Sequence, residues 1–220
     1  AQLVASGSSH VTVEGAKIVE GRGGGVMFQE TAHGSLEDVA ISGTALAAID
    51  LATAAFVSIE ELTLDANHSS GVIVRPNGRL LLAGSKLDRS KEGHVWIMSG
   101  AQAAIANCHI GGGKLGVWVQ GGGTAYVYRT VVEQQEAAAI DAQQGARVVV
   151  SKCRIAGAGG DGVIAAPGSS VDIAFAEIGG VGGAGVRAVD GASVRLADSV
   201  VEGCRGGDVV GRVDVAGSKV

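Results

Sequence analysis

Apolar residues return along this chain at a fixed interval of 23 residues, in three columns that each run through nine repeats. The first column is Val26, Ile49, Val72, Val95, Val117, Ile140, Val163, Val186 and Val209. The second is Ile18, Ile41, Leu64, Leu87, Ile110, Val132, Ile155, Ile178 and Val201. The third is Val13, Leu36, Ile59, Leu82, Ile105, Val127, Val150, Ile173 and Leu196. Each column has one step of 22 residues, which places a missing residue in the loop between Gly111 and Leu115.

Within each repeat the pattern has a period of two, as in Val95-Trp96-Ile97, which is typical of β-strands. Glycines recur where the chain must turn, at Gly145, Gly168 and Gly191, because glycine accepts the positive φ of a sharp bend. A helical-repeat solenoid would need a period of 3.6 residues and few glycines. The sequence therefore predicts an all-β fold, a single-stranded right-handed parallel β-helix of about nine coils with three short strands in each.

The repeat runs through residues 1–220, which we interpret as one β-helix domain. Neither end carries a recognisable capping segment, and solenoids need their open ends covered. We therefore expect the domain to belong to a larger protein, or to associate with other copies through its open ends.

The composition excludes several classes of function but does not identify one. The formal net charge is −5 and the isoelectric point about 5.5, which argues against nucleic-acid binding. No apolar run reaches the length of a membrane span. The three cysteines, Cys108, Cys153 and Cys204, are too few and too scattered for a disulfide framework. We expect no cofactor, and the sequence does not indicate a cellular compartment.

Two kinds of segment carry a family resemblance. They are the Gly-Val-x-Val strands, such as Gly71–Val74 and Gly116–Val119, and the Ile-x-Asn-Cys-x-Ile segment at Ile105–Ile110. Both resemble the pectate-lyase-like family of right-handed β-helices, over essentially the whole chain. The resemblance implies that the outer face of the Gly-Val-x-Val sheet carries the ligand groove. It also implies an inward polar ladder, here Ser85, Cys108, Thr130, Cys153, Ala176 and Ser199.

The outer face of that sheet is the predicted ligand surface. Its central positions are Met27, Asp50, Ile73, Trp96, Trp118, Asp141, Ile164, Arg187 and Val210. Trp96 and Trp118 are the only tryptophans, and they fall on adjacent coils, where exposed aromatic rings can stack on sugars or anchor a protein. In the alternative interpretation they cover each other or pack under another segment. Arg75, Gln120 and Asp141, together with Met98 and Gln143, would supply polar contacts beside them.

Catalytic candidates are weaker. Because polysaccharide-cleaving β-helices use an Arg-x-Lys pair and a histidine, the resemblance suggests Arg89, Lys91 and His94 as catalytic residues if the chain is an enzyme. The Asn-Thr-Asp, Asp-Asp and Gly-His-Gly segments of polygalacturonases are missing, so we interpret 89–94 as a solvated charged loop. Asp50 and Asp141 lie four coils apart, too far for an acid–base pair.

Other apparent motifs carry no function. Residues 157–162 and 180–185 both spell G-x-G-x-x-G, but they are the same loop in consecutive coils and open no helix for a phosphate. No histidine has a partner at metal-ligand spacing, so we expect no metal site.

Three functions follow. We favour a non-catalytic binding or scaffold module that presents a flat sheet face to a protein partner or glycan, because repeats this regular leave no long loops to wall an active site. The alternatives are a carbohydrate-active enzyme (lyase, hydrolase or epimerase) and a structural rod that stacks end to end.

Overall fold

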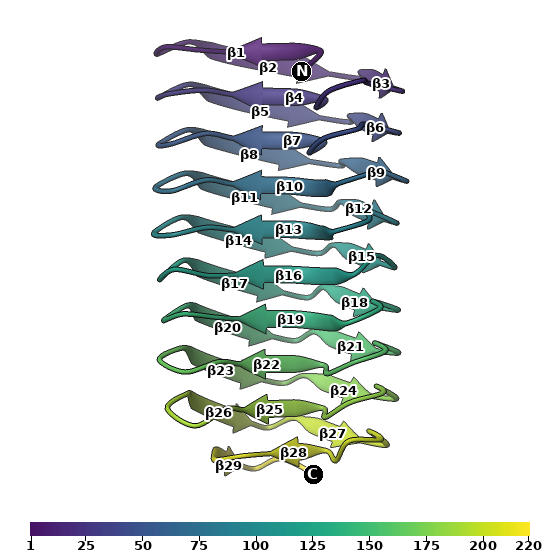
Figure 1. The fold of residues 1–220 in the computed structure, drawn as a ribbon, viewed down its shortest axis with the longest axis vertical. Helices are drawn as coiled ribbons and strands as arrows, with labels where there is room; N and C mark the ends of the chain where they lie inside the picture. Colours follow the sequence, from purple (N-terminus) through teal and green to yellow (C-terminus); the bar gives the residue numbers. More distant parts are fainter.

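The computed structural model describes residues 1–220 as a stack of coils without any helix. Figure 1 shows the coils following one another along a single axis, with the two chain ends at opposite ends of the stack. Each coil contributes one strand to each of three sheets, and every strand pairs in parallel with its counterpart one coil away. The chain thus has no helix that could cross a membrane.

The three sheets, which we call A, B and C, run the length of the stack. The strands of sheet A are β1 (Leu3–Ala5), β4 (Val26–Phe28), β7 (Ile49–Leu51), β10 (Ser70–Val74), β13 (Gly93–Ile97), β16 (Leu115–Val119), β19 (Ala138–Ala142), β22 (Val163–Ala165), β25 (Val186–Ala188) and β28 (Val209–Val210). The strands of sheet B are β2 (His10–Glu14), β5 (His33–Glu37), β8 (Phe56–Glu60), β11 (Arg79–Ala83), β14 (Gln102–Ala106), β17 (Thr124–Tyr128), β20 (Arg147–Ser151), β23 (Ser170–Ala174), β26 (Ser193–Ala197) and β29 (Val213–Ala216). The strands of sheet C are β3 (Lys17–Val19), β6 (Ala40–Ser42), β9 (Thr63–Asp65), β12 (Lys86–Asp88), β15 (His109–Gly111), β18 (Val131–Glu133), β21 (Arg154–Ala156), β24 (Glu177–Gly179) and β27 (Val200–Glu202).

The register of these sheets is the register of the sequence repeat. Val72 pairs with Val95, Val95 with Val117, and Val117 with Ile140. The column from Val26 to Val186 is at most 1% exposed, and only its last member, Val209, is partly exposed at the end of the stack. The three columns supply much of a continuous core of 54 buried residues. The predicted fold class, coil length and inward phase are therefore confirmed.

The predicted corners and the polar ladder are confirmed as well. Gly145, Gly168 and Gly191 have φ values of +77°, +75° and +87°. In the ladder, the Ser85 hydroxyl accepts a hydrogen bond from the Leu62 N–H of the preceding coil (3.1 Å) and donates one to the Ala83 carbonyl (2.8 Å). Thr130 and Ser199 repeat both contacts in their own coils.

Cysteine takes the same ladder position in two coils. The Cys108 and Cys153 thiols lie within 3.3 Å of the carbonyl oxygen two residues earlier, and both side chains are buried. All three cysteines are free. Burial raises the pKa of both ladder thiols, which keeps them in the protonated, unreactive form.

Candidate binding groove

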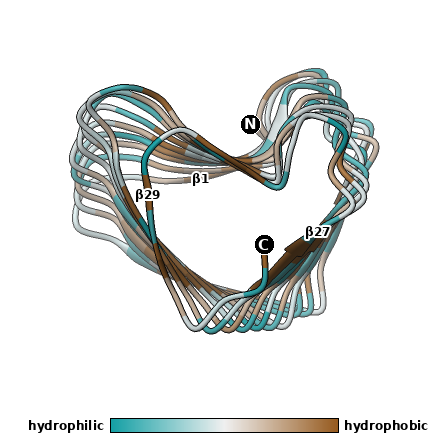
Figure 2. Ribbon diagram, turned by 90° about the horizontal axis from the view of Figure 1, so that it is seen from below, coloured by the Kyte–Doolittle hydropathy of each residue, from teal (hydrophilic) through white to brown (hydrophobic).

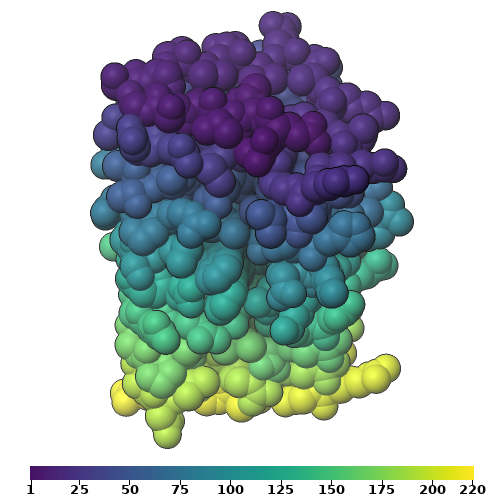
Figure 3. Space-filling model, turned by 45° about the horizontal axis from the view of Figure 1, so that its top comes forward, coloured from purple at the N-terminus to yellow at the C-terminus, as the bar shows by residue number.

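Sheet A lies at the bottom of a groove. Viewed along the axis, the coil has an indented outline, and sheet A forms the indented side between two lobes of turns and loops (Figure 2). The space-filling view shows the same face hollowed along its middle (Figure 3). The expectation of a flat face is therefore wrong, because the short loops that enter sheet A from sheet C rise beside it even without long insertions.

Part of this groove is a cavity of about 540 Å³ over β10, β13, β16 and β19. We call it the central groove. Its lining residues are Ser69, Ser70, Ile73, Glu92, Gly93, Val95, Trp96, Lys114, Leu115, Trp118 and Asp141. Cavities of this size in proteins commonly hold small molecules or segments of larger ligands.

Two tryptophans form the floor of the central groove. Trp96 and Trp118 are register partners on β13 and β16, and their rings stack with centroids 4.6 Å apart and planes inclined by 16°. This separation matches the spacing of neighbouring strands, so the rings stack along the solenoid axis. The predicted adjacency is confirmed, and so is the alternative interpretation that the rings cover each other. Neither indole N–H has a hydrogen-bond partner.

Asp141 stands next to the tryptophan stack, as the register partner of Trp118 on β19. It is only 7% exposed. Its Oδ2 accepts a hydrogen bond from the Gln143 side chain (2.9 Å), whereas its Oδ1 is buried without any partner. Burial raises the pKa of this carboxyl group, the Gln143 hydrogen bond lowers it, and the charge of Asp161 raises it further, so that the pKa lies above its usual range.

Two further acids along the floor of the groove, Asp50 and Asp161, form ion pairs with arginines. The Asp50 carboxylate accepts hydrogen bonds from two nitrogens of the Arg75 guanidinium, Nε at 2.8 Å and Nη2 at 2.7 Å. Asp161 receives two contacts from Arg187, at 2.7 and 3.0 Å, and one from the Ala184 N–H. Burial alone would raise the pKa of Asp161, but these hydrogen bonds bring it below its usual value.

The pairing of Arg75 bears on its predicted role. Its guanidinium is hydrogen-bonded to Asp50, so those N–H groups are not free to bind a ligand. Gln120, the other predicted polar contact, is half-buried at the end of β16 and lies outside the cavity lining. The sequence placed Glu92 and Lys114 in charged rim loops but did not predict them as ligand contacts, and both are exposed on the groove wall. Their position in the loops just before β13 and β16 was the available signal.

The three catalytic candidates do not come together. Arg89 forms a bidentate ion pair with Asp65 at the end of sheet C (2.6 and 2.9 Å). Lys91 is exposed in the loop, as expected. His94, however, is fully buried, so its assignment to a solvated loop is wrong.

The burial of His94 has a structural cause. In the neighbouring coils its position is occupied by Gly71 and Gly116. The imidazole fills space against the loop that is one residue short, and a Cβ on Gly113 would come within 3.1 Å of its Nε2. Nε2 donates a hydrogen bond to the Gly112 carbonyl (2.9 Å), whereas Nδ1 has no partner. Burial lowers the pKa of His94, although the hydrogen bond to Gly112 opposes this effect.

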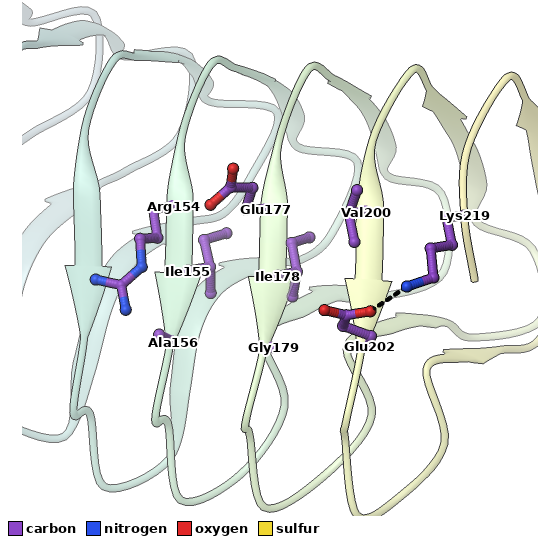
Figure 4. A pocket seen from close by; sticks show the side chains of 9 residues that line it. All are labelled: Arg154, Ile155, Ala156, Glu177, Ile178, Gly179, Val200, Glu202 and Lys219. Carbon is purple, nitrogen blue, oxygen red and sulfur yellow. Dashed lines mark hydrogen bonds and ion pairs between the residues drawn. The ribbon is translucent and has the colours of Figure 1, made fainter.

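A second depression, of about 520 Å³, lies on the outer face of sheet C near the C-terminal end. Figure 4 shows Arg154 and Glu177 beside it and Glu202 bonded to Lys219 (2.6 Å). Ile155 and Ile178 belong to the core, so the depression is shallow and walled mainly by flexible charged side chains. It offers no aromatic surface and no buried polar atom without a partner, and we regard the central groove as the better site.

No three His, Cys, Asp or Glu side chains lie together in an arrangement that could hold a metal ion.

The structure is similar to that of the periplasmic alginate epimerase AlgG, with a TM-score of 0.59, 9% identity, and coverage of 99% of this chain and 76% of the other. It is also similar to the A-module of the Azotobacter vinelandii mannuronan C-5 epimerase AlgE4, with a TM-score of 0.57, 12% identity, and coverage of 96% and 79%.

A protein of Geobacillus virus E2, ORF18, shares the fold with a TM-score of 0.55, 11% identity, and coverage of 96% and 50%. At these identities the likeness concerns the fold alone. No curated protein matches the sequence. The model of the family described as "Right handed beta helix region" matches residues 2–114 and 100–212. The chain therefore belongs to the right-handed β-helix family.

Proposed function

We propose that this chain is a non-catalytic binding module whose central groove holds a segment of a glycan. The observation that carries the proposal is the Trp96–Trp118 stack at the floor of a cavity of about 540 Å³. Indole rings present a broad apolar surface to the C–H faces of sugars. Serine, glutamate and lysine side chains on the same walls add further polar contacts.

The distribution of acids supports binding over cleavage. Glycoside hydrolysis needs two carboxyl groups about 5 to 9.5 Å apart. Asp50 and Asp141 are separated by four strand spacings, about 19 Å. Arg75 and Arg187 pair with Asp50 and Asp161, so Asp141 is the one floor carboxylate without an arginine partner.

An enzyme is the competing function, and one observation favours it. A buried carboxyl group with a raised pKa beside a cavity is a recurrent feature of catalytic sites. Asp141 would then act as a single acid–base group in an elimination or epimerisation. Such chemistry also needs a cation to stabilise the developing charge, and Lys114 is the only cation among the lining residues.

The test is a glycan array followed by calorimetric titration of the best ligand. We expect the double variant Trp96→Ala/Trp118→Ala to lose binding by at least about tenfold. The matched control, Tyr126→Ala/Tyr128→Ala, removes two exposed aromatic rings from sheet B and should leave binding unchanged.

The same ligands are incubated with the protein to detect product. Cleavage or epimerisation that disappears in Asp141→Asn would replace the binding module with the enzyme. Equal loss of binding in both double variants would show that the central groove is not the site. Binding to a protein partner without any glycan ligand would contradict the proposed ligand class.

A further inference from the structure

The charges of the central groove indicate which glycans it accepts. Among its lining residues, Glu92 and Asp141 are acidic and Lys114 alone is basic. The two guanidinium groups along the floor, those of Arg75 and Arg187, are already neutralised by bidentate contacts with aspartates. The floor therefore holds a carboxylate without a counter-ion, and Lys114 on the wall is the one unpaired cation of the central groove beside the two acids Glu92 and Asp141.

The tryptophan stack places an aromatic face next to the Asp141 carboxylate. Because the rings stack along the solenoid axis, each covers one face of the other and leaves its second face uncovered by its partner. The second face of Trp118 is turned toward β19, where Asp141 is its register partner. An aromatic face next to a carboxylate is the arrangement that binds organic ammonium groups, through cation–π attraction and charge pairing together.

We propose that the central groove binds a glycan that carries a free amine, with the ammonium group against Trp118 and Asp141. This inference rests on the proposed function and deepens it. A uronate at the same place would set a second carboxylate against Asp141, where desolvation makes like-charge repulsion strong. Burial already raises the pKa of Asp141, which shows that its charge lacks the solvation that an ammonium group would replace.

The experiment compares three tetrasaccharides by calorimetry, in a mildly acidic buffer in which the amine is protonated. They are a β-1,4-linked glucosamine tetramer, its fully N-acetylated form, and a mannuronate tetramer. We expect the glucosamine tetramer to bind at least about tenfold more tightly than the N-acetylated form, and the mannuronate tetramer not to bind. Rising salt should weaken binding of the amine ligand.

Two variants locate the effect. Asp141→Asn should reduce binding of the glucosamine tetramer by at least about tenfold and change binding of the N-acetylated tetramer little. The control, Asp172→Asn, removes a partly exposed acid from the outer face of sheet B and should change neither. A melting curve in the same buffer shows that each variant is folded.

The outcomes separate the two proposals. Binding of the N-acetylated or mannuronate tetramer as tightly as the amine, or an unaltered amine affinity in Asp141→Asn, overturns the amine inference and leaves the glycan-binding function standing. Failure of all tetramers and of a wider glycan array overturns both. A lysine-rich peptide is the last arm, and its binding in preference to every sugar would also overturn both, because the occupant would then be a protein.

Discussion

The centre of the sheet A groove differs from the stretches on either side of it, which we call its ends and which hold Asp50 on β7 and Asp161 just before β22, in how its polar groups are paired. At the ends, Asp50 and Asp161 each meet an arginine in two short hydrogen bonds. In the centre, the indole N–H groups of Trp96 and Trp118 and one oxygen of Asp141 have no partner in the protein. Polar groups at the ends are thus satisfied within the fold, whereas these atoms in the centre are buried without a hydrogen-bond partner.

The repeat makes this difference informative. All coils have the same strand arrangement, so adjacent strands of one sheet differ mainly in their side chains. A buried polar group without a partner costs about 1–3 kcal/mol. Three such atoms on adjacent strands of one face are therefore a departure that the fold itself does not require.

The largest expected effect is on folding stability, from a substitution on the inward face of β19. Ile140 is fully buried, and Asp141, the next residue, faces the groove. Ile140→Asp should prevent folding, since an unpaired carboxylate would enter the core at a cost of several kcal/mol. The exposed Glu136→Ala, in the same coil, should change the free energy of unfolding by less than about 0.5 kcal/mol. Circular dichroism with urea denaturation measures both, and equal effects would contradict the inward phase.

The next effect comes from removing the ion pair at one end of the groove. Arg75→Ala leaves Asp50, which is 7% exposed, without its counter-ion. We expect a loss of about 1–3 kcal/mol in the free energy of unfolding, the cost of an unsatisfied buried group. Arg79→Ala, an exposed arginine of β11 outside any ion pair, is the control and should cost less than about 0.5 kcal/mol. Similar values for the two arginines would mean that the ends are not held by their ion pairs.

A pH titration of stability tests the buried histidine beneath the groove wall. Burial lowers the pKa of His94 in the folded state, so the unfolded chain binds its proton first as the pH falls. Stability from this group is present above the unfolded pKa of about 6.5 and falls by up to about 1.4 kcal/mol per pH unit below it, until the folded pKa is reached. His94→Gln should flatten this part of the profile, whereas the exposed His33→Gln should not. An identical profile in all three proteins would show that His94 is accessible.

The smallest expected effect concerns the centre. The pKa of Asp141 is raised in the folded state, so its contribution is favourable below the unfolded pKa of about 3.9 and is lost as the pH rises through the folded pKa. Asp141→Asn should therefore raise the free energy of unfolding at neutral pH by on the order of 1 kcal/mol. Below about pH 3.9 the gain should disappear. A loss of stability at neutral pH would mean that the carboxylate has a structural partner.

The repeat made the fold predictable because one register decides the inside and outside of every strand. Val72, Val95 and Val117 could be placed in the core, and Trp96 beside Trp118, by counting residues alone. The polar ladder followed from the family resemblance, since Ser85 and Thr130 occupy one position of the coil. A period of 23 residues carries this information nine times over.

Loops and ion pairs were less predictable because they depend on loop conformation and on side-chain length and orientation, which the register of the repeat does not determine. His94 was expected at the rim, but the shorter loop of the next coil closes over its ring. Arg75 was expected to contact a ligand, but Asp50, one coil away, binds its guanidinium. The face was expected to be flat, since counting residues does not show how far a short loop rises beside a sheet (Figure 2).

We expect a ligand to bind against the tryptophan stack. Trp96 and Trp118 are the only tryptophans, so intrinsic tryptophan fluorescence reports on this one site. Titration with the best glycan ligand should shift or quench that emission with the same saturation curve that calorimetry gives for binding. Saturable binding by calorimetry with an unchanged tryptophan emission would contradict the account, because the ligand would then occupy another surface.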